Sequence, residues 1–318
     1  MDLIFTNANR VDQGVLSAYA FDLSFGAEEN DFEMTVGRSE AVIEYGAFIY
    51  MEGTEYGGIV DTKKTHTNDD SITYMGRTWH GVLNSKVVQP DAGETHYITS
   101  GDANAILATL ISRLGLDGLF VANTEASGVN ISKYKFHRYC KAYDGIRDML
   151  ADNGGKLQIV WKDRAVYLSA VPITDHTEAP VDGDIAALTV ERHEQKVNHL
   201  VCLGRGELAE REVVHWYADQ NGAIVETQHY TGLDEVADVY DNSNSDDLAS
   251  DGRKKLAELR DNDKAEIALN EDEERIYDIG DIVGASDVAS GVSVVATVSQ
   301  KIVKINNGAV SIEYKTGS

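Results

Sequence analysis

Residues Val294–Lys315 read VVATVSQKIVKINNGAVSIEYK, two runs of alternating apolar and polar residues on either side of Asn306-Asn307-Gly308. Alternation with a period of two is typical of a strand with one buried face. Asn-Gly favours a type I′ turn, in which Gly308 adopts a positive φ. The segment therefore predicts a β-hairpin, and a slip in the alternation between Val298 and Ile302 predicts a β-bulge. The predicted buried face comprises Val294, Ala296, Val298, Ile302, Val310, Ile312 and Tyr314.

The β pattern continues upstream of this hairpin. One helix interrupts it at 245–260, and Gly252 is expected to weaken the middle of that helix. Its apolar side carries Leu248, Leu256 and Leu259. Residues 176–318 therefore predict a β-barrel that contains one helix. Its further strands are expected at 188–192, 197–203, 211–217, 223–230, 266–269 and 282–283.

The N-terminal part of the sequence also has the pattern of a β domain. Residues 20–36 alternate around a turn at 26–31, and 47–60 predict a second hairpin with Gly53 near its turn. Residues 71–83 are rich in aromatic and β-branched side chains, which favour strands. Several short strands without a helix predict a first small β-barrel over 1–94.

Between these two regions the hydrophobic period becomes helical. Ser100-Gly101-Asp102 opens a helix that Gly115 ends, and a second helix is predicted over 143–153. Strands at 156–161 and 165–171 follow, joined by Lys162-Asp163-Arg164. Residues 95–175 therefore predict an α+β insert, and the fold class predicted for the chain is α+β, mainly β. The helical core positions are Ile106, Leu107, Leu110, Ile111 and Leu114, then Ile146, Met149 and Leu150.

The charge of the chain excludes some functions. Asp and Glu number 53 against 28 Lys and Arg, which gives a formal charge of -25. Duplex nucleic acid and anionic membranes are bound mainly through Lys and Arg, so both are poor partners for this chain. Only three Pro residues occur, which suits long strands because Pro removes a ladder donor.

Segments for targeting and covalent bridging are also not predicted. The N-terminus lacks the apolar run of a signal peptide, and no stretch is long enough to predict a membrane-spanning helix. Cys140 and Cys202 are the two cysteines, and they form no CxxC pattern. We therefore expect neither a disulfide framework nor a zinc knuckle, and synthesis in a reducing cytoplasm.

Motifs that could carry metal or nucleotide chemistry are incomplete. His193-Glu194 and His199 are six residues apart in a strand-like run, whereas a zincin needs two His four apart on a helix. Asp241–Gly252 lacks the Gly and Glu positions of an EF-hand, so we interpret it as a loop in which Ser245 caps the next helix. Gly204-Arg205-Gly206 predicts a turn, as does the acidic run Glu271–Glu274. We predict no catalytic, cofactor-binding or metal-binding residues.

Three stretches carry a family resemblance. Tyr74–Leu83 (YMGRTWHGVL) resembles a GRxxxGIL-like stretch of the hub proteins in phage tail tips. Ile276–Gly284 (IYDIGDIVG), together with the hairpin at 294–315, resembles the C-terminal part of the same family. Asn198–Gly206 (NHLVCLGRG) resembles a strand in the middle of these proteins. None of the three is a catalytic signature.

The resemblance implies a structural baseplate-hub protein that closes the distal end of a phage tail tube. It implies a homotrimer in which each chain supplies two barrels of the tail-tube type, so that three chains match a six-fold tube. The implied partners are the distal tail protein ring, the tape-measure protein and a spike or receptor-binding protein, and the implied location is the virion tail tip. Because the sequence stops at Ser318, directly after the last predicted strand, we expect a receptor-binding or peptidoglycan-cleaving activity to be absent or to lie on another polypeptide.

The excess of acid suggests a role for the charge in such a ring. Acidic walls repel phosphates, so DNA can pass through without being held. Two other functions remain open at this point. One is a carboxylate-based hydrolase of cell-wall glycan, because carboxylates are abundant. The other is a carbohydrate- or receptor-binding module that uses Trp79, Trp161 and Trp216 as stacking residues, although the run Tyr74, Trp79 and His80 favours a place in the core.

Overall fold

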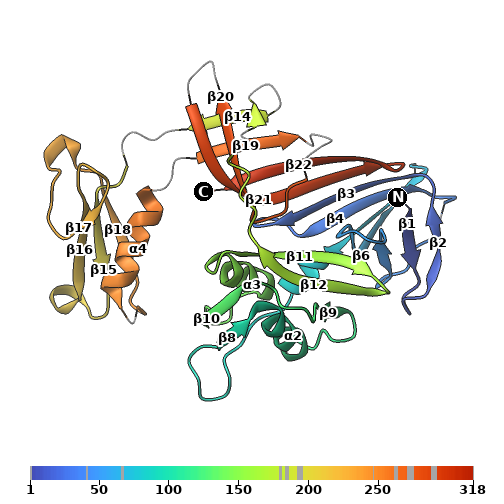
Figure 1. Cartoon of the computed structure of the whole chain (residues 1–318), viewed down its shortest axis with the longest axis horizontal. Coiled ribbons are helices and arrows are strands. Elements are labelled where there is room, and N and C mark those ends of the chain that lie inside the picture. The colour runs from blue at the N-terminus through green and yellow to red at the C-terminus, as the bar shows by residue number, and fades with distance from the viewer. Residues whose placement is uncertain are drawn as a thin grey trace. The chain divides into compact units, whose positions relative to one another are not determined.

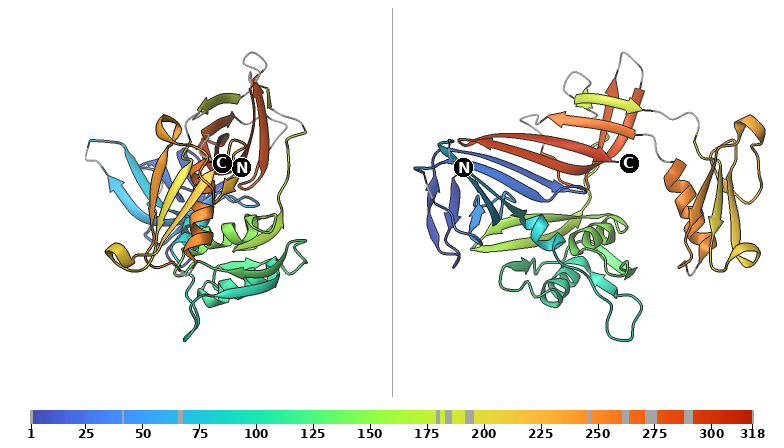
Figure 2. Two further views of the ribbon diagram at one scale, coloured as in Figure 1. Left: turned by 90° about the vertical axis from the view of Figure 1, so that its left-hand side faces the viewer. Right: turned by 180° about the vertical axis from the view of Figure 1, so that it is seen from behind.

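The computed structural model describes residues 2–40, 42–65, 68–178, 181–182, 186–191, 196–245, 247–260, 264–270, 276–287 and 292–317. The chain forms two compact units, Met1–Leu188 with Ile267–Gly317, and Thr189–Glu266. Strands dominate both units (Figures 1 and 2), so the prediction of an α+β, mainly β fold is confirmed. No helix among the described residues has the length and apolar character needed to cross a membrane.

A single curled sheet forms the framework of the first unit. Its strands follow the order β14-β19-β22-β21-β3-β4-β7-β6-β5-β1-β2, with β20 also paired to β21 and β13 paired to β20. The N-terminal strands are β1 (Leu3–Thr6), β2 (Asp12–Leu16), β3 (Tyr19–Gly26), β4 (Asp31–Gly37), β5 (Phe48–Tyr50), β6 (Gly57–Thr65) and β7 (Ser71–Thr78). The C-terminal strands are β13 (Val181–Asp182), β14 (Ala186–Glu191), β19 (Lys264–Asn270), β20 (Ile282–Asp287), β21 (Val292–Asn306) and β22 (Ala309–Gly317).

The C-terminal hairpin forms as predicted. β21 pairs antiparallel with β22 up to the pair Asn306–Ala309, and the turn residues Asn307 and Gly308 have φ values of 49° and 88°. Positive φ at both central positions is the geometry of a type I′ turn. The register shifts between Val298 and Gln300, so the predicted bulge is confirmed as well.

The bulge changes which side chains face the core. Val298 is buried before it, but Val303 and Ile305 are buried after it, in place of the predicted Ile302. An extra residue in one strand reverses the alternation, which is why counting in steps of two past the bulge gave the wrong face. Gly26 lies opposite, with a φ of 142°, and a Cβ there would be 2.3 Å from the carbonyl oxygen of Ser299.

The hairpin belongs to the same sheet as the N-terminal strands. β21 pairs antiparallel with β3 from Gln300–Gly26 to Asn306–Ala20, and Figure 1 shows these strands side by side. One hydrophobic core contains Phe21 and Leu23 of β3 together with Val303 and Ile312 of the hairpin. Strands of the two predicted barrels, 1–94 and 176–318, therefore pair in one sheet and share a core. Hydrophobic alternation specifies the buried face of a strand but not which distant strand it pairs with.

The α+β insert has the predicted elements. Asp102 caps the first helix by accepting from the backbone N–H of Asn104, and Gly115 follows the helix end with a φ of 67°. The second helix ends just before Gly154, whose φ is 71°. The elements are β8 (Ile98–Asp102), α2 (Ala103–Arg113), β9 (Phe120–Ala122), β10 (Asn130–Lys135), α3 (Ala142–Ala151), β11 (Gly155–Lys162) and β12 (Ala165–Pro172).

The insert is not an independent domain. Its core includes Phe48 of β5 and Trp79 of α1 (Trp79–Asn84), and Trp161 of β11 stacks on Trp79 with ring centroids 5.0 Å apart. The predicted boundary between 94 and 95 therefore cuts through a shared core. α1 itself corrects the strand predicted over 71–83: the strand ends at Thr78, whose hydroxyl accepts from the backbone N–H of Gly81 and starts a helix.

A buried lysine joins the insert to the segment that leads into β20. Lys156 of β11 lies 2.7 Å from Asp281 and 2.9 Å from Asp278, measured between Nζ and a carboxylate oxygen. Asp281 also accepts from the backbone N–H groups of Thr174 and Asp278. Both aspartates belong to the IYDIGD stretch on which the family resemblance was partly based. That stretch therefore has a structural task, because a buried Lys requires a charge partner.

The second unit has a small core of its own. Its sheet has the order β17-β16-β15-β18, with β15 and β18 parallel. Leu200, Cys202 and Trp216 from the sheet pack with Leu248 and Leu256 from the helix α4. The elements are β15 (His199–Leu203), β16 (Val213–Ala218), β17 (Ile224–Val225), β18 (Ala237–Asp241) and α4 (Leu248–Arg260).

Two expectations for α4 are corrected. Asp247 caps the helix by accepting from the backbone N–H of Ser250, whereas Ser245, the predicted cap, donates to the side chain of Asp251. Gly252 has a packing role: a Cβ at this position would lie 2.3 Å from Sγ of Cys202 and 3.1 Å from the Trp216 ring. The cost in helix propensity is offset by close contact between helix and sheet.

Candidate functional surface

The face of the curled sheet opposite to its core is acidic. In β3 the side chains of Phe21, Leu23 and Phe25 are buried, so those of Asp22 and Ser24 point to the other face. In the register of β3 and β4, Asp22 lies opposite Glu33, and Ser24 lies opposite Asp31. Like charges directly opposite one another destabilise a strand pair, whereas Lys304 of β21 places an opposite charge on the other side of Asp22.

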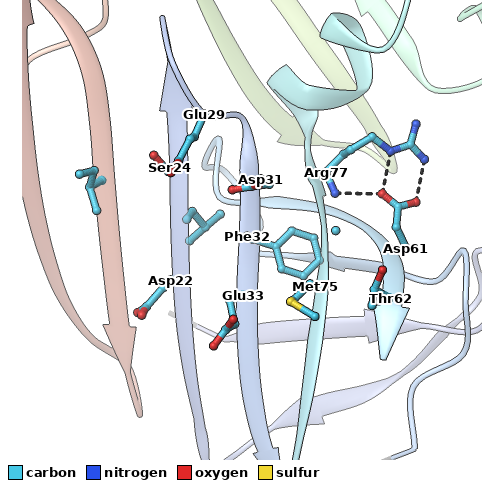
Figure 3. A pocket seen from close by; sticks show the side chains of 13 residues that line it. Asp22, Ser24, Glu29, Asp31, Phe32, Glu33, Asp61, Thr62, Met75 and Arg77 are labelled. Carbon is cyan, nitrogen blue, oxygen red and sulfur yellow. Dashed lines mark hydrogen bonds and ion pairs between the residues drawn. The ribbon is translucent and has the colours of Figure 1, made fainter. Parts of the chain in front are cut away.

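These residues line a shallow hollow of about 470 Å³ on the surface. Figure 3 shows Asp22, Asp31 and Glu33 on neighbouring strands, with Glu29 above them. Ile302 of β21 also lines the hollow, so the N-terminal and C-terminal strands build this surface together. We call the carboxylates that line the hollow the acidic face: Asp22, Glu29, Asp31, Glu33 and Asp61.

The one guanidinium in the hollow is already committed. Arg77 lies opposite Asp31 in the register of β4 and β7, but its Nε and one Nη donate to both carboxylate oxygens of Asp61, at 2.7 and 2.8 Å. Hydrogen bonds from Arg77 lower the pKa of Asp61. Burial, followed by the charge of Glu29, raises the pKa of Asp31. The remaining carboxylates give the face a negative field, which repels anions and attracts cations.

On the core face of the sheet, the charged side chains are buried and paired. Lys301 is 3% exposed, and its Nζ lies 2.7 Å from Oε1 of Glu55. Burial alone would raise the pKa of Glu55, but the charge of Lys301 and the nearby His80, whose Nε2 lies 3.6 Å from Oε2 of Glu55, hold that pKa at about 2. Burial also lowers the pKa of His80, whose ring stacks on Phe25 with centroids 4.3 Å apart. This Lys301–Glu55–His80 network connects β21 to α1 and to the β5–β6 turn.

The candidate metal and nucleotide motifs can now be placed. His193 and Glu194 lie outside the described residues, as does the run Glu271–Glu274. Nδ1 of His199 donates to a carboxylate oxygen of Glu235 at 2.6 Å, and its Nε2 lies 2.8 Å from Nδ1 of His215. Both ring nitrogens are therefore engaged by partners that the sequence analysis did not identify. Among the described residues, no group of three or more His, Cys, Asp or Glu is placed to hold a metal ion. Cys140 and Cys202 are free thiols.

The three tryptophans are core residues, so the stacking role considered for them is wrong. Trp79 is 0% exposed, Trp161 3% and Trp216 9%, and the indole N–H of Trp216 donates to the backbone carbonyl of Ala249. Tyr74 and His80 are buried as well, as predicted for the aromatic run. An exposed aromatic platform for a sugar ring is therefore not built from these side chains.

Comparison with known proteins relies on structure. No family model and no curated protein matches the sequence. A 43 kDa tail protein of prophage MuSo2 from Shewanella oneidensis has 12% identity and a TM-score of 0.55, over 100% of this chain and 98% of that chain. Prophage tail protein gp18 from Listeria monocytogenes EGD-e has 12% identity and a TM-score of 0.54, over 99% and 94%.

The chain therefore has the fold of phage and prophage tail proteins, which confirms the predicted resemblance at the level of the fold. A chain of the phage P2 baseplate, in its activated conformation with Ca, is similar too. It has 12% identity and a TM-score of 0.50, over 99% of this chain and 98% of that chain.

Proposed function

We propose that this chain is a structural baseplate-hub protein that closes the distal end of a phage tail tube. The observation that carries the proposal is the likeness to tail proteins over the full length of the chain, a baseplate chain among them. The chain assembles as a homotrimer at the virion tail tip, between the distal tail protein ring, the tape-measure protein and a spike or receptor-binding protein. Its role is mechanical, without an active site.

The acidic face supports a more specific role for the curled sheet. A channel for DNA must not retain phosphates, and a wall of carboxylates keeps the duplex away from its surface. Asp22 and Glu33 are exposed and lie directly opposite one another, which is unfavourable for the pairing of β3 with β4. We assign this face to the wall of the channel in the assembled ring.

Assembly is tested with the purified chain, alone and with the neighbouring tail proteins expressed beside it. Mass photometry is expected to show a trimer of the 34.8 kDa chain, formed alone or on the distal tail protein ring. A chain that stays monomeric and binds neither the ring nor the tape-measure protein contradicts the proposal. Zymography on cell walls addresses the enzyme alternative: clearing that is lost on mutating a carboxylate pair would establish a hydrolase.

The channel assignment is tested by changing charge in two steps. Asp22→Asn with Glu33→Gln neutralises the pair, and Asp22→Lys with Glu33→Lys reverses it. We expect virions of both variants to assemble, with DNA release slowed slightly by neutralisation and about tenfold or more by reversal, because Lys retains phosphate. The delay should shrink as salt rises, since salt screens the contact.

A matched reversal in the second unit, Glu207→Lys with Glu210→Lys, controls for net charge, because both residues are exposed there. Equal delays for the two reversals, or no delay for either, would show that the acidic face does not line the DNA path.

A further inference from the structure

A second, smaller cavity lies where the N-terminal strands meet the insert. It has a volume of about 220 Å³ and is lined by residues from four segments of the first unit. Arg10 comes from the β1–β2 loop, Phe48 from β5, Gly118 from the loop before β9, and Trp161 and Arg164 from the β11–β12 hairpin. The fold therefore brings residues that are far apart in the sequence together around one cavity.

The cavity combines an aromatic floor with two cations at its rim. Phe48 and Trp161 are each 3% exposed, whereas Arg10 and Arg164 are exposed. The guanidinium of Arg10 lies over the Phe48 ring, 5.0 Å from its centroid, and also contacts the carbonyl oxygen of Gly118 at 3.4 Å. Neither arginine forms an ion pair with any described residue. In a chain with a formal charge of -25, two guanidiniums at the rim of one cavity are a local excess of positive charge.

The backbone at both arginines is unfavourable for this residue type. Arg10 has a φ of 64° and Arg164 a φ of 63°, in turns where Gly or Asn costs less. Asp163, beside Arg164 in the two-residue turn, is also left-handed, with a φ of 51°. Local strain of this kind persists where a side chain is needed for another reason. The two strained arginines line the same cavity, so we look for that reason there.

Asp12 limits the charge that the cavity accepts. It lines the same cavity and accepts a hydrogen bond of 2.8 Å from the hydroxyl of Tyr50, which fixes its position. Among the residues that line the cavity, two guanidiniums and one carboxylate leave a single excess positive charge. A singly charged anion matches this balance, while a phosphate carries up to two negative charges at neutral pH.

We propose that this cavity binds a carboxylate carried on a small apolar body. The planar guanidinium presents paired N–H donors that fit a carboxylate, and the aromatic floor receives the apolar part. The cavity is smaller than the roughly 300 Å³ at which pockets for drug-sized ligands begin, so it takes one side chain or one sugar ring. The carboxylate can come from an acidic or C-terminal residue of a neighbouring protein, or from a carboxylated sugar.

Phenylacetate is the probe, and the uncharged phenylacetamide is its matched control. Binding is followed on the full chain by the indole N–H resonance of Trp161, assigned with Trp161→Phe. We expect saturable shifts with phenylacetate and binding at least about tenfold weaker with phenylacetamide, because the charged hydrogen bonds are lost. Equal binding of the acid and the amide, no saturable shift with phenylacetate, or tighter binding of inorganic phosphate would each overturn the proposal.

Arg164→Gly separates the function of the side chain from its place in the fold. Glycine relieves the positive φ, so the variant should melt no lower than the wild-type chain. Its affinity for phenylacetate should fall about tenfold or more. Arg164→Lys should retain only part of the wild-type affinity, because lysine lacks the paired N–H donors of a guanidinium. Unchanged affinity in Arg164→Gly contradicts the assignment. Short peptides with a free or amidated C-terminus, and glucuronate against glucose, then distinguish the two sources of the carboxylate.

Discussion

Charged side chains are buried and paired on one face of the curled sheet and exposed on the other. On the core face Lys301 is buried, and Glu55 lies 2.7 Å from its Nζ. On the acidic face of the same strands, Asp22 lies between Glu33 of β4 and the exposed Lys304 of β21 in the register of the sheet. Lys301 and Lys304 are three residues apart in β21, yet the first is enclosed and the second is exposed.

The difference shows which charges the fold requires. A buried ion must be paired, because desolvation costs several kcal/mol per charge. An exposed carboxylate has no such requirement, and surface pairs contribute at most about 1 kcal/mol. The core-face pair is therefore expected to be essential for stability, while the acidic face is free to serve the assembled tail. Mutations on the two faces should separate these roles.

The largest effect is expected for Lys301→Met. Removing the cation leaves Glu55 with a buried charge, which should lower the free energy of unfolding by about 3 to 5 kcal/mol at pH 7. Because the folded-state pKa of Glu55 is held at about 2, its contribution is present above its ordinary pKa and is lost as pH falls towards 2. The difference in the free energy of unfolding between variant and wild type should therefore become smaller as the pH falls. Denaturant unfolding at pH 7 and pH 3.5 measures this.

Two further variants control this experiment. Lys304→Met removes an exposed charge from the same strand and should change stability by less than about 0.5 kcal/mol. Combining Lys301→Met with Glu55→Leu removes both charges and should recover much of the loss, since a buried pair can be replaced by apolar side chains. A Lys301→Met chain as stable as the wild type would show that the network does not contribute to folding.

The turn of the C-terminal hairpin should have an intermediate effect. Gly308→Val places a β-branched residue at a φ of 88° and should cost about 1 to 3 kcal/mol through backbone strain. A Cβ at this position meets nothing within 4 Å, so steric contact does not add to the cost. Gly308→Asn is the matched control, because Asn tolerates the left-handed region. Equal melting temperatures for the Val variant and the wild type would contradict the type I′ turn.

The loss should spread to the N-terminal strands, which follow the hairpin in the sheet. Asn307 receives a hydrogen bond from the backbone N–H of Tyr19 and donates its own N–H to the carbonyl of the same residue. β3 then continues the sheet from β21. We therefore expect hydrogen exchange in β3 to rise together with that in β21 when the turn is strained.

Local features of this fold could be predicted from the sequence because their causes are local. Asn307-Gly308 favours its own turn, and Asp102 caps its own helix. The broken alternation after Val298 indicated the bulge, although not the consequence that Val303 would replace Ile302 in the core. These signals depend on neighbouring residues in the chain.

The pairing of β3 with β21 could not be predicted, because nothing in either strand encodes the other across more than 270 residues of chain. The acidic face was not predicted for a different reason: Asp22 and Glu33 lie in one predicted hairpin, but they become neighbours only when the register of β3 and β4 is known. The cavity between Arg10 and Arg164 depends on a contact between two turns far apart in the sequence. An unusual residue at a turn position, such as Asp163-Arg164 where Asn-Gly is favoured, was the one signal available.

The smallest effect is expected on the acidic face itself. Burial and the charge of Glu29 raise the pKa of Asp31, so the folded chain binds this proton more tightly than the unfolded chain does. The stabilising contribution of protonated Asp31 is thus present below its ordinary pKa and is lost as pH rises through the folded-state value. At pH 7 the ionised group opposes folding. Asp31→Asn should therefore raise the melting temperature slightly and increase the free energy of unfolding by less than about 0.5 kcal/mol. At pH 3, where the wild-type carboxyl is already protonated, the two chains should melt together. A variant that melts lower than the wild type at pH 7 would mean that a partner stabilises the ionised Asp31. The carboxylates of this face would then contribute to the stability of the fold.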